Sequence, residues 1–152
     1  MYMIEDFRKV DFEAISKMSF DTPPQWGQMT LQHMIEHLAI LFEVADGNNK
    51  VDVVTPPEKV EKVKRLFLLS DRELQRNFKA PILPENPIPY RFSGINEAIT
   101  NLKNRITDFE NYYKNNPAQT ENHPVFGALN YNEWLHFHNK HFTHHFKQFN
   151  LI

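Results

Sequence analysis

The feature that most restricts how this chain can fold is a late segment in which histidines recur with helical spacing. From Trp134 to Gln148 the sequence reads W-L-H-F-H-N-K-H-F-T-H-H-F-K-Q and holds five of the eight histidines. An α-helix turns about 100° per residue, which places His138, His141 and His145 within about 40° of Trp134. Aromatic and aliphatic side chains border this face. We therefore expect the face to be buried, and buried imidazoles need polar partners.

His141 and His145 form the motif H-x-x-x-H, whose spacing suits a metal ion. Residues four apart rise about 6 Å along a helix, so two imidazoles can converge on one ion through bonds of about 2.0–2.1 Å. The same spacing also arises by chance, and a core histidine often only hydrogen-bonds a carbonyl group. The motif therefore predicts a metal site only if another part of the chain supplies a third ligand.

A second predicted helix, from about residue 30 to residue 47, supplies that ligand. Its apolar side chains share one face; they are Leu31, Met34, Leu38, Leu41, Phe42 and Ala45. His37 falls on the apolar side and is the third predicted metal ligand, whereas His33 lies at the edge. The predicted site is thus His37, His141 and His145, with His33 a possible neighbour at the rim.

The same stretch contains a competing motif. Residues His33 to His37 match H-x-x-E-H, the inverted signature of one class of zinc protease, in which Glu36 would be the general base. The helical angles place Glu36 and Glu43 on the polar face of this helix, away from the core. We therefore interpret the match as accidental.

Helical patterns and their breaks organise the rest of the chain. Apolar spacing predicts a first amphipathic helix over residues 4–19 and a third long helix over about 93–113. Thr55-Pro56-Pro57 starts a short helix, and four prolines between Pro81 and Pro89 predict a non-helical crossover. Asn130 to Glu133 forms a capping box for the last helix.

Together these elements predict an all-α fold with one domain over residues 1–152. The expected architecture is a four-helix bundle with a long crossover and a short extra helix between the second and third helices. Hydrophobic residues make up 41% of the chain, which is enough for a core.

Composition removes several classes of function. The formal charge is -2 and no long basic run occurs, which argues against a nucleic-acid partner. The chain has no Cys, so disulfides, thiolate ligands and a Cys nucleophile are excluded. The first residues have no apolar core typical of a signal peptide, and no apolar run is long enough to span a membrane. We expect a soluble, cytoplasmic protein.

The motifs resemble the DinB/YfiT-like superfamily of metal-binding helical bundles, in particular a branch without an assigned activity. The likeness rests on H-P-x-F-G at 123–127, on Glu133-Trp134, and on H-x-x-H-H-x-x-Q-F at 141–149, and it extends from Trp26 onward. In that superfamily one ligand comes from the second helix and two from H-x-x-x-H on the last, which selects His37 a second time.

The resemblance implies one divalent ion, zinc or nickel, on three histidines with open positions. Such an ion lowers the pKa of a bound water or thiol. The implied activity is a metal-dependent hydrolase or an S-transferase that uses a low-molecular-weight thiol such as bacillithiol or mycothiol. The implied partners are a small-molecule substrate and a second copy of the chain in a homodimer.

His138 is the predicted catalytic residue, one turn before His141 on the same face. It is expected to orient a ligand, to act as a general base or to serve as a fourth ligand. Trp134 and His123 are expected at the mouth of the site or, alternatively, in the core and in a stabilised loop. The alternative function is a non-catalytic, metal-stabilised bundle that serves as a dimerisation or binding module.

Overall fold

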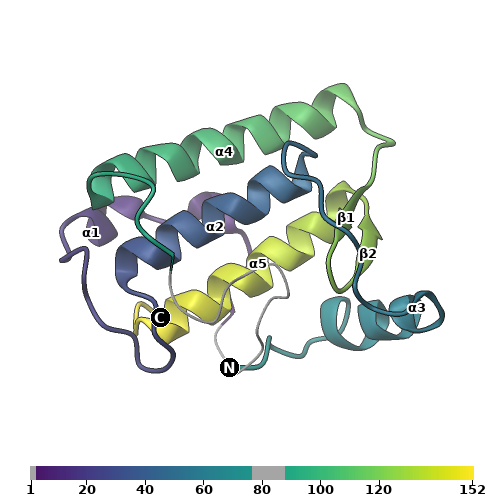
Figure 1. The fold of residues 1–152 in the computed structure, drawn as a ribbon, viewed down its shortest axis with the longest axis horizontal. Coiled ribbons are helices and arrows are strands. Elements are labelled where there is room, and N and C mark those ends of the chain that lie inside the picture. The colour runs from purple at the N-terminus through teal and green to yellow at the C-terminus, as the bar shows by residue number, and fades with distance from the viewer. Residues whose placement is uncertain (1–2, 77–87) are drawn as a thin grey trace.

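Three long helices dominate the computed structural model, which describes residues 3–76 and 88–152 (Figure 1). They are α2 (Leu31–Ala45), α4 (Ile95–Asn115) and α5 (Tyr131–Gln148). α2 packs against both α4 and α5, and Figure 1 shows it lying between them. The predicted helical class and these three helices are confirmed, including the capping box at the start of α5.

The N-terminal segment differs from the prediction. Instead of one amphipathic helix over residues 4–19, it forms a short 3-10 turn, η1 (Phe7–Lys9), and a short helix, α1 (Phe12–Ser16). Asp6 and Asp11 each accept a hydrogen bond from the backbone N–H two residues further on. These aspartates cap two separate turns and so interrupt the continuous helix that the apolar spacing favoured. The predicted fourth long helix is therefore wrong.

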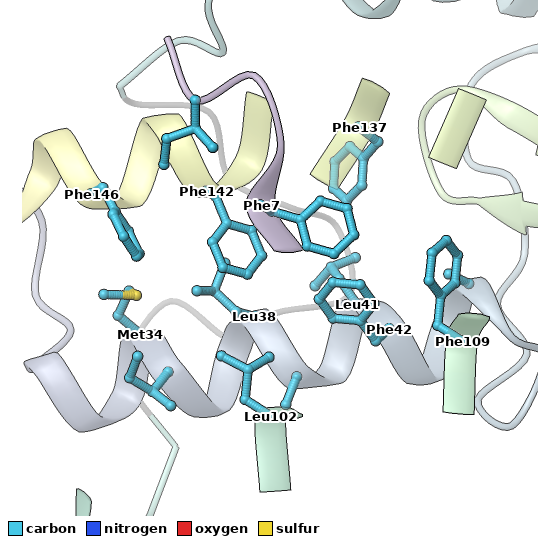
Figure 2. Packing of buried hydrophobic residues seen from close by; sticks show 14 of the residues in the cluster. Phe7, Met34, Leu38, Leu41, Phe42, Leu102, Phe109, Phe137, Phe142 and Phe146 are labelled. Carbon is cyan, nitrogen blue, oxygen red and sulfur yellow. The ribbon is translucent and has the colours of Figure 1, made fainter. Parts of the chain in front are cut away.

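Phe7 nevertheless brings this segment into the core. Its ring is fully buried, with its centroid 5.3 Å from that of Phe42 on α2 and 5.4 Å from that of Phe142 on α5. Figure 2 shows these rings between α2 and α5, with Leu38 beside them. Burying one Phe side chain stabilises a fold by about 1.5–3 kcal/mol, so Phe7 is a principal anchor of the N-terminal segment.

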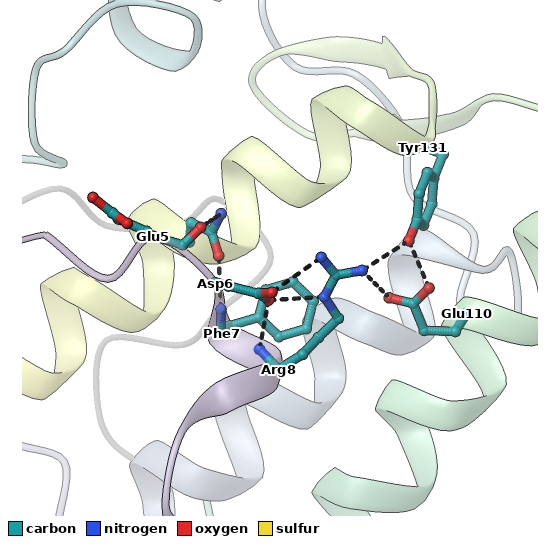
Figure 3. A network of polar contacts seen from close by, with 7 residues as sticks. Glu5, Asp6, Phe7, Arg8, Glu110 and Tyr131 are labelled. Carbon is teal, nitrogen blue, oxygen red and sulfur yellow. Dashed lines mark hydrogen bonds and ion pairs between the residues drawn. The ribbon is translucent and has the colours of Figure 1, made fainter.

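A polar network on the surface fixes the same segment to the other helices (Figure 3). Arg8 pairs with Asp6 at 2.8 Å, and its guanidinium donates to the Tyr131 hydroxyl at 3.3 Å. Tyr131 donates to Glu110 of α4 at 2.6 Å. Because Arg8 is exposed, the network adds little to the stability of the fold and serves mainly to orient the N-terminal segment.

The connection from α2 to α4 contains the predicted short extra helix. It consists of three consecutive pieces: η2 (Pro57–Lys59), α3 (Val60–Val63) and the π-helical turn η3 (Lys64–Leu68). Most of the predicted crossover from Pro81 to Pro89 lies outside the described residues. Its last two residues, Ile88 and Pro89, have no regular secondary structure.

A small β-hairpin precedes α5, where the sequence predicted only a loop. Strands β1 (Glu121–His123) and β2 (Gly127–Leu129) pair antiparallel, with His123 opposite Gly127. Gly127 has a φ of 77°, and a Cβ added there would lie 2.6 Å from Cγ1 of Val60. Glycine is therefore required at this turn, both by the backbone and by the close approach of α3.

Candidate metal centre

Three predicted ligands meet where α2 and α5 pack together. His37 comes from α2, and His141 and His145 come from successive turns of α5. Their side chains are buried, and one nitrogen from each lies within 4.8 Å of the nitrogens of the other two. The predicted inward direction of His37 is confirmed. The group is of a kind that could hold a metal ion.

The three imidazole nitrogens lie at hydrogen-bonding distance, which raises the question of whether hydrogen bonds alone can satisfy them. Nε2 of His141 lies 2.9 Å from Nε2 of His37 and 3.0 Å from Nε2 of His145. A ring nitrogen of a neutral imidazole has either one N–H or one lone pair in the ring plane, so Nε2 of His141 can form only one well-directed hydrogen bond. One of the two contacts is therefore not a well-directed hydrogen bond, whereas a cation among the three nitrogens would satisfy all three lone pairs.

Burial keeps these imidazoles neutral and so keeps their lone pairs available. Burial, with the neighbouring His144, lowers the pKa of His37 to about 4. Burial also holds the pKa of His141 and His145 well below the usual 6.5, with a smaller contribution from the other histidines of the group. Neutral imidazole is the form that binds metal ions, so the donor set fits a divalent cation near neutral pH.

One hydrogen bond and one aromatic ring hold two of the ligands in place. Nδ1 of His145 lies 2.7 Å from Oε1 of Gln148. The Phe137 ring stacks on His141, with centroids 5.0 Å apart and planes 24° apart. Nδ1 of His37 and Nδ1 of His141 are buried and have no hydrogen-bond partner within the described residues. The group is therefore buried with few hydrogen bonds of its own, and burial strengthens electrostatic interactions inside it.

His138 lies beside this group but makes no hydrogen bond to it. Its ring is fully buried between Phe42, at 3.8 Å between centroids, and Trp134, at 5.6 Å. Neither of its nitrogens has a hydrogen-bond partner in residues 3–76 or 88–152. The catalytic role assigned to His138 from the sequence stays a prediction. His136, predicted to face outward, is exposed.

Glu36 corrects one prediction about the ligand helices. It is 3% exposed instead of lying on a polar surface, because the chain entering α4 covers that side of α2. Its carboxylate accepts hydrogen bonds from the backbone N–H of Arg91 at 2.7 Å and from the Gln32 amide at 2.9 Å. Glu36 therefore anchors the start of α4 and is not among the clustered residues, which agrees with rejecting the protease motif.

The other residues considered from the sequence have structural contacts. His33 caps α2, since its Nδ1 accepts from the Thr30 N–H at 3.2 Å. Trp134 is fully buried in the core. His123 stabilises the hairpin turn, because its Nδ1 accepts from the N–H groups of the residues two and three positions on, at 3.0 and 3.3 Å. Burial lowers the pKa of His123 to about 3.

The sequence singled out Gln148 but not its second partner. The Gln148 amide donates to the carbonyl oxygen of Trp26 at 2.9 Å, across 122 residues of chain. A contact of that sequence separation leaves no periodic signal; only the Gly27 that follows Trp26 marks the turn.

Within the described residues, no helix is long and apolar enough to cross a membrane.

Comparison with known proteins places the chain in a family. Residues 62–151 match the model of a family described as "Protein of unknown function (DUF1569)". Because the match covers more than half of the 152 residues, the chain belongs to the DUF1569 family. The matched region contains His141 and His145 but begins after His37. Neither the curated proteins nor the solved structures contain a match.

Proposed function

We propose that this DUF1569 protein is a metal-dependent enzyme of the DinB/YfiT-like type, with His37, His141 and His145 as the ligands of one divalent ion. The observation that carries the proposal is the pair of Nε2 separations, 2.9 and 3.0 Å, because both end on Nε2 of His141, which can form only one well-directed hydrogen bond. The short N-terminal pieces η1 and α1 would then take the place of the fourth helix of such a bundle.

The separations also suit a shared ion. Two ligands with bonds of 2.0–2.1 Å are about 2.9 Å apart at right angles and about 3.4 Å apart at the tetrahedral angle. The separations of 2.9 and 3.0 Å lie at the lower end of this range. Zinc and nickel both bind imidazole nitrogen, and the proposed ion is one of these two.

Three neutral ligands leave the charge of a divalent ion intact, and such an ion supplies Lewis-acid activation of a water or a low-molecular-weight thiol. The chain buries the three ligands, which excludes bulk water, and places the Phe137 ring on His141. The acidic residues of α2 take no part, since Glu36 is occupied by the start of α4 and Glu43 pairs with Arg91 at 3.3 Å. The proposed reaction is hydrolysis or thiol transfer to an electrophilic small molecule.

One observation favours a second function. The three ligands are only 6–7% exposed, so an ion held by them would join α2 to α5 inside the core. A structural ion of this kind would stabilise the fold without catalysis, because binding to the native state alone raises the free energy of unfolding.

Metal content and turnover separate these functions. Protein purified without a metal-affinity tag would be analysed for bound metals, then stripped, reloaded with nickel or zinc, and assayed with ester, amide and thiol-plus-electrophile substrates. The enzyme proposal expects about one ion per chain and turnover that is lost on stripping and restored on reloading. Bound metal that raises the melting temperature without any metal-dependent turnover would favour the structural ion.

A further inference from the structure

The side-chain amide of Gln148 lies between two partners that fix its orientation. On one side is the carbonyl oxygen of Trp26, 2.9 Å from Nε2, and on the other is Nδ1 of His145, 2.7 Å from Oε1. A backbone carbonyl only accepts hydrogen bonds, so the NH2 group of Gln148 must face Trp26. The amide oxygen must therefore face His145.

This orientation determines where His145 carries its proton. An amide oxygen cannot donate, so Nδ1 of His145 must be the donor in the 2.7 Å hydrogen bond. In a neutral imidazole the other nitrogen then holds a lone pair. Nε2 of His145 is the nitrogen that lies 3.0 Å from His141, so the lone pair is directed into the three-histidine group.

The loop that contains Trp26 is shaped around Gln148. The N–H of Gln25 donates to the backbone carbonyl of Gln148 at 2.7 Å. Gly27 has a φ of 80°, and a Cβ added there would lie 3.0 Å from Nε2 of Gln148. The end of α5 is thus held against this loop by one backbone and one side-chain hydrogen bond.

We infer that Gln148 is a positioning residue that holds His145 in the Nδ1–H tautomer and links the Trp26 loop to the three-histidine group. The positioning role rests on the proposed metal site. The tautomer of His145 follows from the two hydrogen bonds of Gln148 and applies to the metal-free protein too. Ligating histidines characteristically donate their second N–H to an oxygen acceptor, and loss of such a partner weakens metal binding by about 10–100-fold. In this chain a side-chain amide tied to a remote carbonyl has that role.

The first test needs no substitution. The tautomer of His145 is read from long-range nitrogen–proton correlations of the metal-free wild type at neutral pH, with its signals assigned by their loss in His145→Ala. The expected result is a protonated Nδ1 and a bare Nε2. A bare Nδ1, or a mixture of both tautomers, would overturn the inference.

The second test compares nickel affinity, measured by competition with a chromophoric chelator, in matched variants. Gln148→Leu should bind nickel about 10–100-fold more weakly and should populate both tautomers of His145. Gln148→Glu keeps an oxygen acceptor for Nδ1 but loses the N–H that donates to the Trp26 carbonyl, so it should retain the Nδ1–H tautomer and lose less nickel affinity than Gln148→Leu. Gln32→Leu is the control, because Gln32 is also a buried glutamine, whose amide donates to Glu36 and to the Phe92 carbonyl and to none of the three histidines.

The outcomes keep the two proposals apart. Equal loss of nickel affinity in Gln148→Leu and Gln32→Leu would mean a general loss of structure and would overturn the positioning role. If the wild type binds neither nickel nor zinc and yet shows the Nδ1–H tautomer, the metal proposal fails while the tautomer assignment of Gln148 stands.

Discussion

Nε2 of His37 on α2 lies 2.9 Å from Nε2 of His141 on α5, although 104 residues separate them in the chain. Both imidazoles are buried, and burial lowers the pKa of each. One hydrogen bond could join this pair, but Nε2 of His145 lies 3.0 Å from the same nitrogen of His141, which can form only one well-directed hydrogen bond. The proposed ion accounts for the pair and for His145 in the same way.

Removal of any one ligand should weaken metal binding sharply. His37→Ala, His141→Ala and His145→Ala each leave two imidazoles, and we expect nickel affinity to fall by at least about 100-fold, more than for loss of a supporting residue. His136→Ala is the matched control on the same helix, since His136 is exposed and should leave affinity unchanged. Isothermal titration of the tag-free proteins measures the difference. Equal affinities for the ligand variants and the control would contradict the ligand assignment.

These ligands could be identified from the sequence because they lie on regular helices. The period of 3.6 residues places His141 and His145 on one face and turns His37 toward the core, and the structure brings the three together. The capping box of Asn130 and Glu133 is equally local, and it is present at the start of α5. Features that depend on spacing along one element were therefore predictable.

The predictions that failed depend on contacts between distant parts of the chain or on polar side chains that bond nearby backbone N–H groups and so interrupt a helix. Glu36 is buried where Arg91, 55 residues away, brings its backbone N–H to the carboxylate, a contact that helical angles do not report. Asp6 and Asp11 divide the N-terminal helix by local capping, which an apolar pattern does not report. The three-residue strands of the hairpin are too short for an alternating pattern to be recognised.

His138→Leu tests the imidazole with two unpartnered nitrogens. Because neither nitrogen has a hydrogen-bond partner within the described residues, an apolar side chain of similar size should raise the free energy of unfolding by about 1 kcal/mol. Nickel affinity should not change, since His138 makes no hydrogen bond to the three-histidine group. Urea unfolding of the two metal-free proteins gives the comparison. A lower stability in the variant would show that His138 has a polar partner after all.

Acid should destabilise the metal-free protein, and the contribution of His123 to this effect can be measured separately. Burial lowers its pKa in the folded state to about 3, below the unfolded value of about 6.5. Between these values the unfolded chain binds a proton that the folded chain does not. The stability contributed by neutral His123 is therefore fully present above about pH 6.5 and falls by about 1.4 kcal/mol per pH unit below it.

The measurement is the free energy of unfolding as a function of pH, in the presence of a chelator, for the wild type and for His123→Asn. Asn keeps an oxygen acceptor for the two backbone N–H groups of the hairpin turn but does not titrate. Around pH 5 the slope for the variant should be lower than that of the wild type by about 1.4 kcal/mol per pH unit. Identical slopes would mean that His123 is protonated in the folded state.

Gly127→Ala should destabilise the hairpin for two separable reasons. The φ of 77° is unfavourable for alanine, and the new Cβ would lie 2.6 Å from Cγ1 of Val60. We expect a loss of about 1–3 kcal/mol in the free energy of unfolding. In a Val60→Ala background the steric part should disappear, so the loss should be smaller. A double-mutant cycle in urea measures this coupling, and strict additivity would contradict the close approach of α3 to the turn.

The central claim, one divalent ion on His37, His141 and His145, is tested most directly by an anomalous difference map. Crystals of nickel-loaded protein would be measured on both sides of the nickel absorption edge. The account predicts a single strong peak about 2.1 Å from Nε2 of each of the three histidines. The absence of a peak among these nitrogens in fully loaded protein, or a nickel ion held by other residues, would contradict it.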